Sequence, residues 1–286
     1  MDLLFLFSRL SLQLLFKVIL GATLAGMACS LIGVFVVHLK ITAIGFSMSH
    51  AAFAGAALGL LINSYLSFDP LISASIFAIA VALLLGPMSE KTRLNPNVVL
   101  GIIFTLSLAL GFIFLSFLPS GVVSSEAVQI LWGSVFGLDW LDFLLLGLVN
   151  LAIVAIIIIF YKEFLATMFH RKVALAAGIN VSFFNFLILF LTALTVSFTL
   201  KIVGALLVYA LIVNPTSTVY QFAYDTKKIF IFSPVVGIIS AIGGVLLSFM
   251  TNFPIGSSII IVSSIIFVVS VIFSPKKRRG IVQQHQ

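Results

Sequence analysis

The sequence contains few charged residues and a single cysteine. Asp, Glu, Lys and Arg make up 8% of the 286 residues, 62% are hydrophobic, and the mean hydropathy is +1.32. A soluble domain of this composition would have an apolar surface, so the sequence indicates an integral membrane protein. One cysteine, Cys29, cannot form an internal disulfide or a metal site of several thiolates, and we expect it to pack as a small apolar residue.

Carboxylates are missing from the interior of the apolar runs. All eight lie at or near the ends of these runs or between them: Asp2, Asp69, Glu90, Glu126, Asp139, Asp142, Glu163 and Asp225. Carriers driven by protons or sodium usually keep acidic side chains at mid-membrane, so this distribution argues against an ion-coupled secondary transporter. The sequence also lacks a G-x-x-x-x-G-K-[ST] phosphate loop and the H-E-x-x-H and G-x-S-x-G hydrolase motifs. We therefore expect a transport subunit that is not an enzyme and is driven by another protein.

Long apolar segments are abundant. A bilayer core about 30 Å thick requires roughly 20 apolar residues per helix. Turn signals separate nine such segments, at residues 14–37, 44–66, 70–88, 97–118, 139–161, 182–200, 202–222, 229–251 and 255–274. They predict an all-α polytopic membrane protein with one transmembrane domain over residues 1–286. Only the region of Lys201 divides 182–200 from 202–222, so eight spans are the alternative to nine.

The basic residues predict the orientation. With nine spans, three of them, Arg9, Lys17 and Lys201, fall on one side of the membrane. Twelve fall on the other: Lys40, Lys91, Arg93, Lys162, Arg171, Lys172, Lys227, Lys228, Lys276, Lys277, Arg278 and Arg279. Because cytoplasmic loops are rich in Lys and Arg, we place the N-terminus outside the cell membrane and the basic tail, residues 275–286, in the cytoplasm. Topology accounts for the net charge of +7, so we expect no nucleic-acid partner.

Two connections are longer than a turn. The outer one, from Pro119 to Leu138, predicts a short helix at the outer membrane surface with Trp132 as an interfacial anchor. The cytoplasmic one, "KEFLATMFHRKVALAAGIN", predicts a short amphipathic helix that stops at Gly178. This helix either lies on the lipid headgroups or docks a soluble partner.

A histidine interrupts the small apolar stretch "GFSMSHAAFAG". His50 has Phe46 one helical turn before it on the same face. Neutral imidazole can ligate zinc, manganese or iron, and a polar side chain in lipid is costly without a function or a buried partner. His50 is therefore either a ligand or gate on a translocation path, or it hydrogen-bonds a carbonyl of a neighbouring helix. A metal site here would need Ser47, Ser49, a residue of another helix, or a second copy of His50.

The same segment carries small residues at intervals of four, namely Ser47, Ala51, Gly55 and Gly59. Such a stripe lets another membrane helix approach closely, so we assign it to helix packing. A second polar candidate for the path is Asn214, which precedes Pro215 in the segment 202–222. The proline either only kinks this helix or helps it line the path.

Five stretches in order along the whole chain resemble those of one transporter family. They are "LIGVFVVHLKITAIGFSMSHAAFAGAALG", "NVVLGIIFTLSLALG", "ILWGSVFGLDWLD", "FYKEFLATMFHRKVALAAGIN" and "KIVGALLVYALIVNPTST". The first is similar to a Gly-x-x-x-Ser-His-Ala-x-x-x-Gly signature. The chain thus resembles the permease subunit of ABC importers for divalent metals, the group that takes up zinc, manganese and iron.

This resemblance implies a set of partners. The permease would form a homodimer, two cytoplasmic ATPase subunits would use the ATP, and an extracytoplasmic binding protein would deliver the metal. The metal is cargo, and no permanently bound cofactor is implied. Residues 164–180 would be the coupling segment that docks on the ATPase, through Phe164, Met168, Phe169, His170, Arg171, Lys172, Ala176 and Gly178.

The chain departs from the family pattern at two places. Relatives usually have an acidic residue four positions before the histidine, where this chain has Phe46. In the coupling segment, His170 and Lys172 stand where relatives often have acids. The sequence does not choose between zinc, manganese and iron. The alternatives to a metal importer are an ABC permease for iron chelates or cobalamin, and an ion-coupled carrier.

Overall fold

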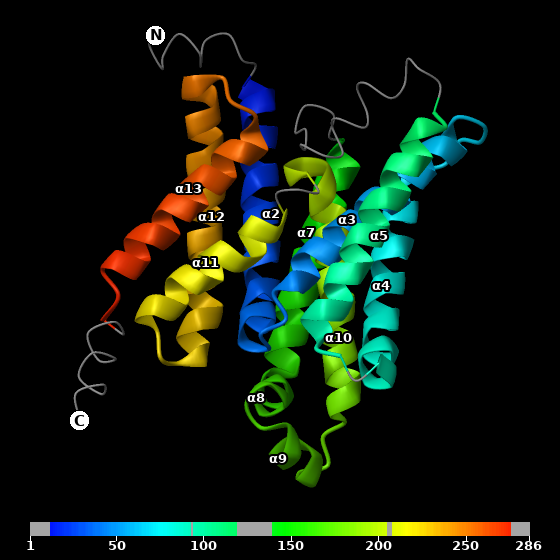
Figure 1. Ribbon diagram of the computed structural model, residues 1–286. Helices are drawn as coiled ribbons and strands as arrows, with labels where there is room; N and C mark the ends of the chain where they lie inside the picture. Colours follow the sequence, from blue (N-terminus) through cyan, green and yellow to red (C-terminus); the bar gives the residue numbers. More distant parts are fainter. Residues whose placement is uncertain (1–11, 93, 119–138, 205–207, 276–286) are drawn as a thin grey trace.

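The computed structural model describes residues 12–92, 94–118, 139–204 and 208–275, and every regular element in these ranges is a helix (Figure 1). The helices are α2 (Leu12–His38), α3 (Ala43–Asn63), α4 (Pro70–Thr92), α5 (Pro96–Ser116), α7 (Trp140–Ile159), α8 (Tyr161–Phe169), α9 (Arg171–Ala176), α10 (Val181–Val203), α11 (Val208–Phe222), α12 (Thr226–Thr251) and α13 (Ile255–Ile272). Nine of them correspond to the nine predicted segments. The predicted surface helix with Trp132 and nearly all of the basic tail lie outside the described residues.

Seven of the helices in the described ranges are long and apolar enough to cross a membrane: α2, α3, α5, α7, α10, α12 and α13. The apolar part of α4, Pro70–Leu85, is shorter, and α11 has 15 residues. At 1.5 Å per residue, α11 extends about 22 Å, less than the bilayer core. Residues 205–207 of the predicted segment 202–222 lie outside the described residues, so the described part of α11 does not test the full span.

The boundary near Lys201 also differs from the prediction. The backbone of Lys201 belongs to α10, which continues to Val203, so this residue does not lie in a connection between two spans. Lysine is a good helix former and does not end a helix. Gly204 does, because it takes a φ of 90°, in the region that favours glycine.

Helix α2 lies in the middle of the bundle and packs against α7, α10, α11 and α12. Helix α3 packs mainly on α4 and α5, and α13 packs on α11 and α12. In Figure 1, α3, α4 and α5 lie to one side of α2, and α12 and α13 to the other. The short helices α8 and α9 form one end of the bundle, opposite the end at which α2 begins.

Glycines allow the closest helix contacts. A Cβ added to Gly26 of α2 would lie 2.6 Å from the carbonyl oxygen of Gly237 in α12, and one added to Gly59 of α3 would lie 2.6 Å from Cα of Pro70 in α4. In lipid, helix association depends on such close van der Waals packing, since burial from water does not drive it. The small residues therefore fix how near α3 lies to α4.

The start of α3 is held by hydrogen bonds to α5. Asn97 Nδ2 donates to the Lys40 carbonyl oxygen at 2.9 Å, and the Ala43 amide donates to Asn97 Oδ1 at 3.4 Å. Asn95 caps α5 by accepting from the Asn97 amide at 2.9 Å. Lys40 has a φ of 57°, so the chain turns sharply between α2 and α3. These bonds position the helix that carries His50.

Candidate functional site

His50 is buried in the middle part of α3, with 2% of its surface exposed. Its Nδ1 lies 2.9 Å from the carbonyl oxygen of Phe46, one turn earlier. A carbonyl can only accept, so this hydrogen bond requires the proton on Nδ1. The neutral ring then keeps its lone pair on Nε2. Metal-ligating histidines usually have this arrangement, with one nitrogen donating to a carbonyl and the other free to bind.

Two aromatic side chains contact this imidazole, Phe104 and Phe46, and a third, Tyr209, stacks on Phe46. The ring of Phe104 in α5 meets His50 edge to face, with centroids 4.6 Å apart. The Phe46 ring stacks on Tyr209 of α11 at 3.8 Å and contacts Phe104 at 6.0 Å. The Phe46 side chain thus belongs to an aromatic cluster that joins α3, α5 and α11.

The two serines beside His50 point to different partners. Ser49 Oγ lies 3.4 Å from His50 Nδ1 and donates to the Phe46 carbonyl at 3.0 Å. Ser47 Oγ donates to the carbonyl oxygens of Ala43 and of Leu100 in α5. Ser49 is therefore next to the imidazole, whereas Ser47 links α3 to α5.

Asn214 pairs with α13, not with His50. Its Nδ2 donates to the hydroxyls of Ser263 and Ser264, both at 3.1 Å. Pro215 lies inside α11, where it cannot donate to the Leu211 carbonyl. The structure thus connects α11 to His50 indirectly, through the Tyr209 ring that stacks on Phe46.

Phe104 and Tyr209 were not among the residues predicted from the sequence. Tyr209 carries a weak signal, a hydroxyl within an apolar stretch. Phe104 carries none, because phenylalanine is ordinary in a membrane helix. Among the described residues, no group of three or more His, Cys, Asp or Glu side chains is placed to hold a metal ion. In the described part of the chain, the polar neighbours of the imidazole are the Ser49 hydroxyl and the Phe46 carbonyl oxygen.

The predicted coupling segment, residues 164–180, forms two helices instead of one. The break is at His170, whose φ of −143° and ψ of 82° are not helical, so α8 and α9 are separate. Gly178 ends the segment with a φ of 80°, as the predicted stop requires. The sequence pattern missed the break because His170 is flanked on both sides by helix-forming residues.

Large apolar side chains are exposed on this helix pair. Phe169 is 51% exposed, Val173 62% and Leu175 54%. His170, Arg171, Lys172, Ala176 and Gly178 are exposed as well, and Met168 is half-buried. An amphipathic pair with apolar residues on its outer face is suited to docking a protein.

Phe164 differs from the other predicted coupling residues because it is buried. Its ring lies 4.8 Å from that of Phe35 in α2 and 5.3 Å from that of Phe184 in α10. Phe35 in turn lies 5.2 Å from Phe230 in α12. Phe164 therefore cannot touch a docked partner directly, and it connects α8 to three helices of the bundle.

A cavity of about 760 Å³ lies between this helix pair and the adjacent ends of α4, α5 and α10. Its polar lining includes Arg171, Asn180 and Thr167. The Thr167 hydroxyl is buried and has no hydrogen-bond partner among the described residues. The coupling segment is therefore packed on the bundle at Phe164, and the cavity lies beside Thr167 and Arg171.

These features together define a multi-pass membrane permease: an apolar helix bundle, one buried imidazole with a free nitrogen, and an exposed amphipathic helix pair at one end. Comparison with known proteins identifies its family. The model of the ABC 3 transport family matches residues 11–274. The chain belongs to this family, and it is the membrane-spanning subunit of an ABC transport system. The family match sets aside the ion-coupled carrier.

The chain is similar to relatives over nearly its whole length. It is 32% identical over 275 residues to the manganese transport system membrane protein MntC of Listeria monocytogenes, covering 96% of this chain and 95% of MntC. It is 29% identical over 253 residues to the high-affinity zinc uptake system membrane protein ZnuB of Haemophilus influenzae, covering 87% and 95%. PsaBC from Streptococcus pneumoniae, solved in complex with Fab, has a similar fold, with a TM-score of 0.83, 26% identity, and 94% and 95% coverage.

Proposed function

We propose that this permease imports a divalent transition metal ion, manganese, zinc or iron, using ATP hydrolysed by a separate subunit. The observation that carries the metal assignment is His50, a buried imidazole whose Nδ1 is fixed on a carbonyl and whose Nε2 keeps its lone pair. The similarity to manganese and zinc permeases over nearly the whole chain supports the same class of cargo.

The site works as a transient station more than as a storage site. Only one imidazole and neutral oxygens face the ion, so binding is weak enough for release. Ser49 is the nearest hydroxyl, while Ser47 and Asn214 support neighbouring helices of the path. The Phe46 ring lies 6.5 Å from the imidazole and stacks on Tyr209 of α11, and this stacked pair acts as a gate.

Coupling to ATP uses the helix pair α8 and α9. An ATPase subunit docks on the exposed face that includes Phe169 and Leu175. The complex contains two ATPase subunits and two copies of the permease, and each permease copy forms one transmembrane domain. An extracytoplasmic protein delivers the metal at the opposite face. Phe164 passes the motion of α8 to α2 and α10 through ring contacts. In this proposal the helix pair and the C-terminal tail lie in the cytoplasm and the N-terminus lies outside.

Replacing His50 by alanine, cysteine and serine tests the metal station. The expected result is that His50→Ala abolishes metal uptake while the complex still assembles. His50→Cys and His50→Ser have similar volumes, but only the thiolate is a strong ligand for zinc. Uptake measured by mass spectrometry of cell-associated metal should therefore recover partly for zinc in His50→Cys and not in His50→Ser.

Equal uptake by the cysteine and serine variants would mean that His50 acts only by its volume, as a gate. Uptake unchanged in His50→Ala would overturn its role on the path. The energy source is checked separately. The permease purified by itself should hydrolyse no ATP. When it is purified from cells that also make the other subunits, it should co-purify with an ATPase subunit.

A further inference from the structure

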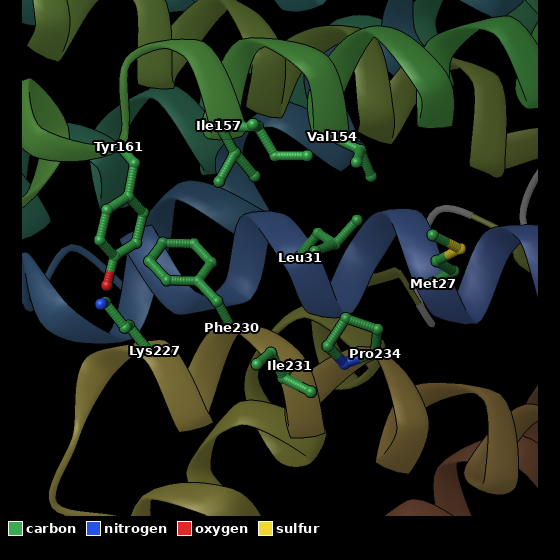
Figure 2. Close-up of a pocket in the computed structure, with 10 residues that line it drawn as sticks. Met27, Leu31, Val154, Ile157, Tyr161, Lys227, Phe230, Ile231 and Pro234 are labelled. Carbon is green, nitrogen blue, oxygen red and sulfur yellow. The ribbon is translucent and has the colours of Figure 1, made fainter.

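A second cavity lies on a different face of the bundle from the His50 cluster. It is a groove of about 600 Å³ between α2, α7 and α12, closed at one end by Tyr161 of α8 (Figure 2). Its volume is in the range of sites for small molecules. The side chains along it are apolar, including Met27, Val154 and Pro234.

The groove has one polar end. Figure 2 shows the Tyr161 hydroxyl and the Lys227 ammonium together at the end of the groove that Tyr161 closes, with Met27 and Pro234 at the other end. The Phe230 ring meets the Tyr161 ring edge to face with centroids 6.0 Å apart, so it separates the polar end from the apolar part. A ligand that fits must be amphipathic, with a polar group at Lys227 and a chain along the helices.

The charges at the polar end favour an anion. Among the described residues, Lys227 is the only charged side chain that lines the groove. The Asp225 carboxylate already caps α12 by accepting from the Lys227 amide at 3.0 Å. Burial, and secondarily the Asp225 carboxylate, raise the pKa of Tyr161, so its hydroxyl stays protonated and can donate to a phosphate oxygen.

We propose that this groove is a binding site for an anionic phospholipid of the cytoplasmic leaflet. One acyl chain lies between α2, α7 and α12, and the phosphate contacts Lys227 and Tyr161. The polar end is at the same end of the bundle as α8 and α9, where headgroups meet the cytoplasm in the proposed topology. Basic pockets between membrane helices on this side suit anionic headgroups. The site goes beyond metal transport and does not depend on which metal is carried.

The headgroup contact is tested with labelled phosphatidylglycerol bound to the full-length permease in detergent. Lys227→Gln should weaken binding about fivefold, the factor that corresponds to about 1 kcal/mol per cation near a membrane surface. Lys228→Gln is the matched control, because it removes the same charge on the next residue, which does not line the groove. It should leave binding within about twofold. Phosphatidylcholine should bind more weakly than phosphatidylglycerol to the unaltered protein.

The contact with the acyl chain of the lipid is tested by filling the groove with a larger side chain. Val154→Trp should abolish retention of phosphatidylglycerol, whereas Leu151→Trp, on the same helix and 67% exposed, should not. Equal effects of the two lysine variants, or full lipid retention in Val154→Trp, would overturn the proposal. Loss of the permease dimer in Val154→Trp with lipid binding unchanged would also overturn it, because the groove would then be an interface between two copies. None of these lipid-binding measurements depends on metal uptake, so their outcome is independent of the His50 experiment.

Discussion

Adding one methyl group to Gly55 should weaken the contact between α3 and α4. A Cβ at this position would lie 2.8 Å from Cβ of Phe77 and 2.9 Å from Cα of Ala74, and closer still to the Ser73 carbonyl oxygen. These atoms are on or next to the backbone, so a rotamer change cannot relieve the clash. Such overpacking costs about 1–3 kcal/mol. The better helix propensity of alanine offsets about 0.5–1 kcal/mol of it.

Two other glycines supply the control for Gly55→Ala. A Cβ added to Gly101 or Gly147 meets nothing within 4 Å. Gly101→Ala and Gly147→Ala therefore gain the same helix propensity without the clash. The free energy of unfolding should differ between Gly55→Ala and these controls by about 1–3 kcal/mol, which is the overpacking cost alone.

The assay is reversible unfolding of the purified permease in mixed micelles, with all three variants measured side by side. Metal uptake should fall in Gly55→Ala as well, since Gly55 lies five residues from His50 on α3. If Gly55→Ala unfolds with the same free energy as Gly101→Ala and Gly147→Ala, the small residues of α3 do not set its distance from α4. The packing argument would then be refuted.

Two further substitutions test the path and the coupling. Phe46→Asp places a carboxylate one turn from His50. Because manganese prefers oxygen ligands more than zinc does, the ratio of manganese to zinc uptake should rise in a competition assay. An unchanged ratio would contradict a role for position 46 in selecting the ion. Phe164→Ala empties a buried site between Phe35 and Phe184, so it should cost about 3–5 kcal/mol of stability. In the assembled complex it should also lower uptake more than ATP hydrolysis, and an equal loss of both would speak against coupling through this ring.

The helices were predictable because their signals are local. Runs of apolar residues set their length, and Asn95, Pro96 and Pro254 mark ends that the structure places within a few residues of the prediction. The break at His170 was not predictable in this way. His170 has an ordinary helix propensity and helix-forming neighbours, yet its backbone is not helical. Tertiary packing overrides a continuous pattern here.

The candidate site was predictable only in part. His50 stands out in the sequence because a polar residue in an apolar helix needs a reason, and its place on α3 could be counted from the segment start. Its partners come from other helices, so their identity depends on which helices pack on α3. Phe104 reaches the imidazole from α5, and Tyr209 of α11 stacks on Phe46 beside it. For the same reason the sequence could not show that Asn214 pairs with α13.

Position 46 acts on His50 through two separate groups. The backbone carbonyl of Phe46 accepts from Nδ1 and so fixes the tautomer that leaves Nε2 free. Any residue at position 46 supplies this carbonyl, so the replacement of an acid by phenylalanine leaves the orientation of the imidazole intact. The side chain alone differs: here it is a ring stacked on Tyr209, where a carboxylate would offer oxygen ligands. Phe46→Asp therefore adds a metal ligand and removes the ring that stacks on Tyr209. Phe46→Leu removes this ring without adding a ligand, so comparing the two variants separates the two effects. A change in metal preference in Phe46→Asp but not in Phe46→Leu assigns selectivity to the ligand, whereas faster uptake of every metal in both variants assigns the ring to the gate.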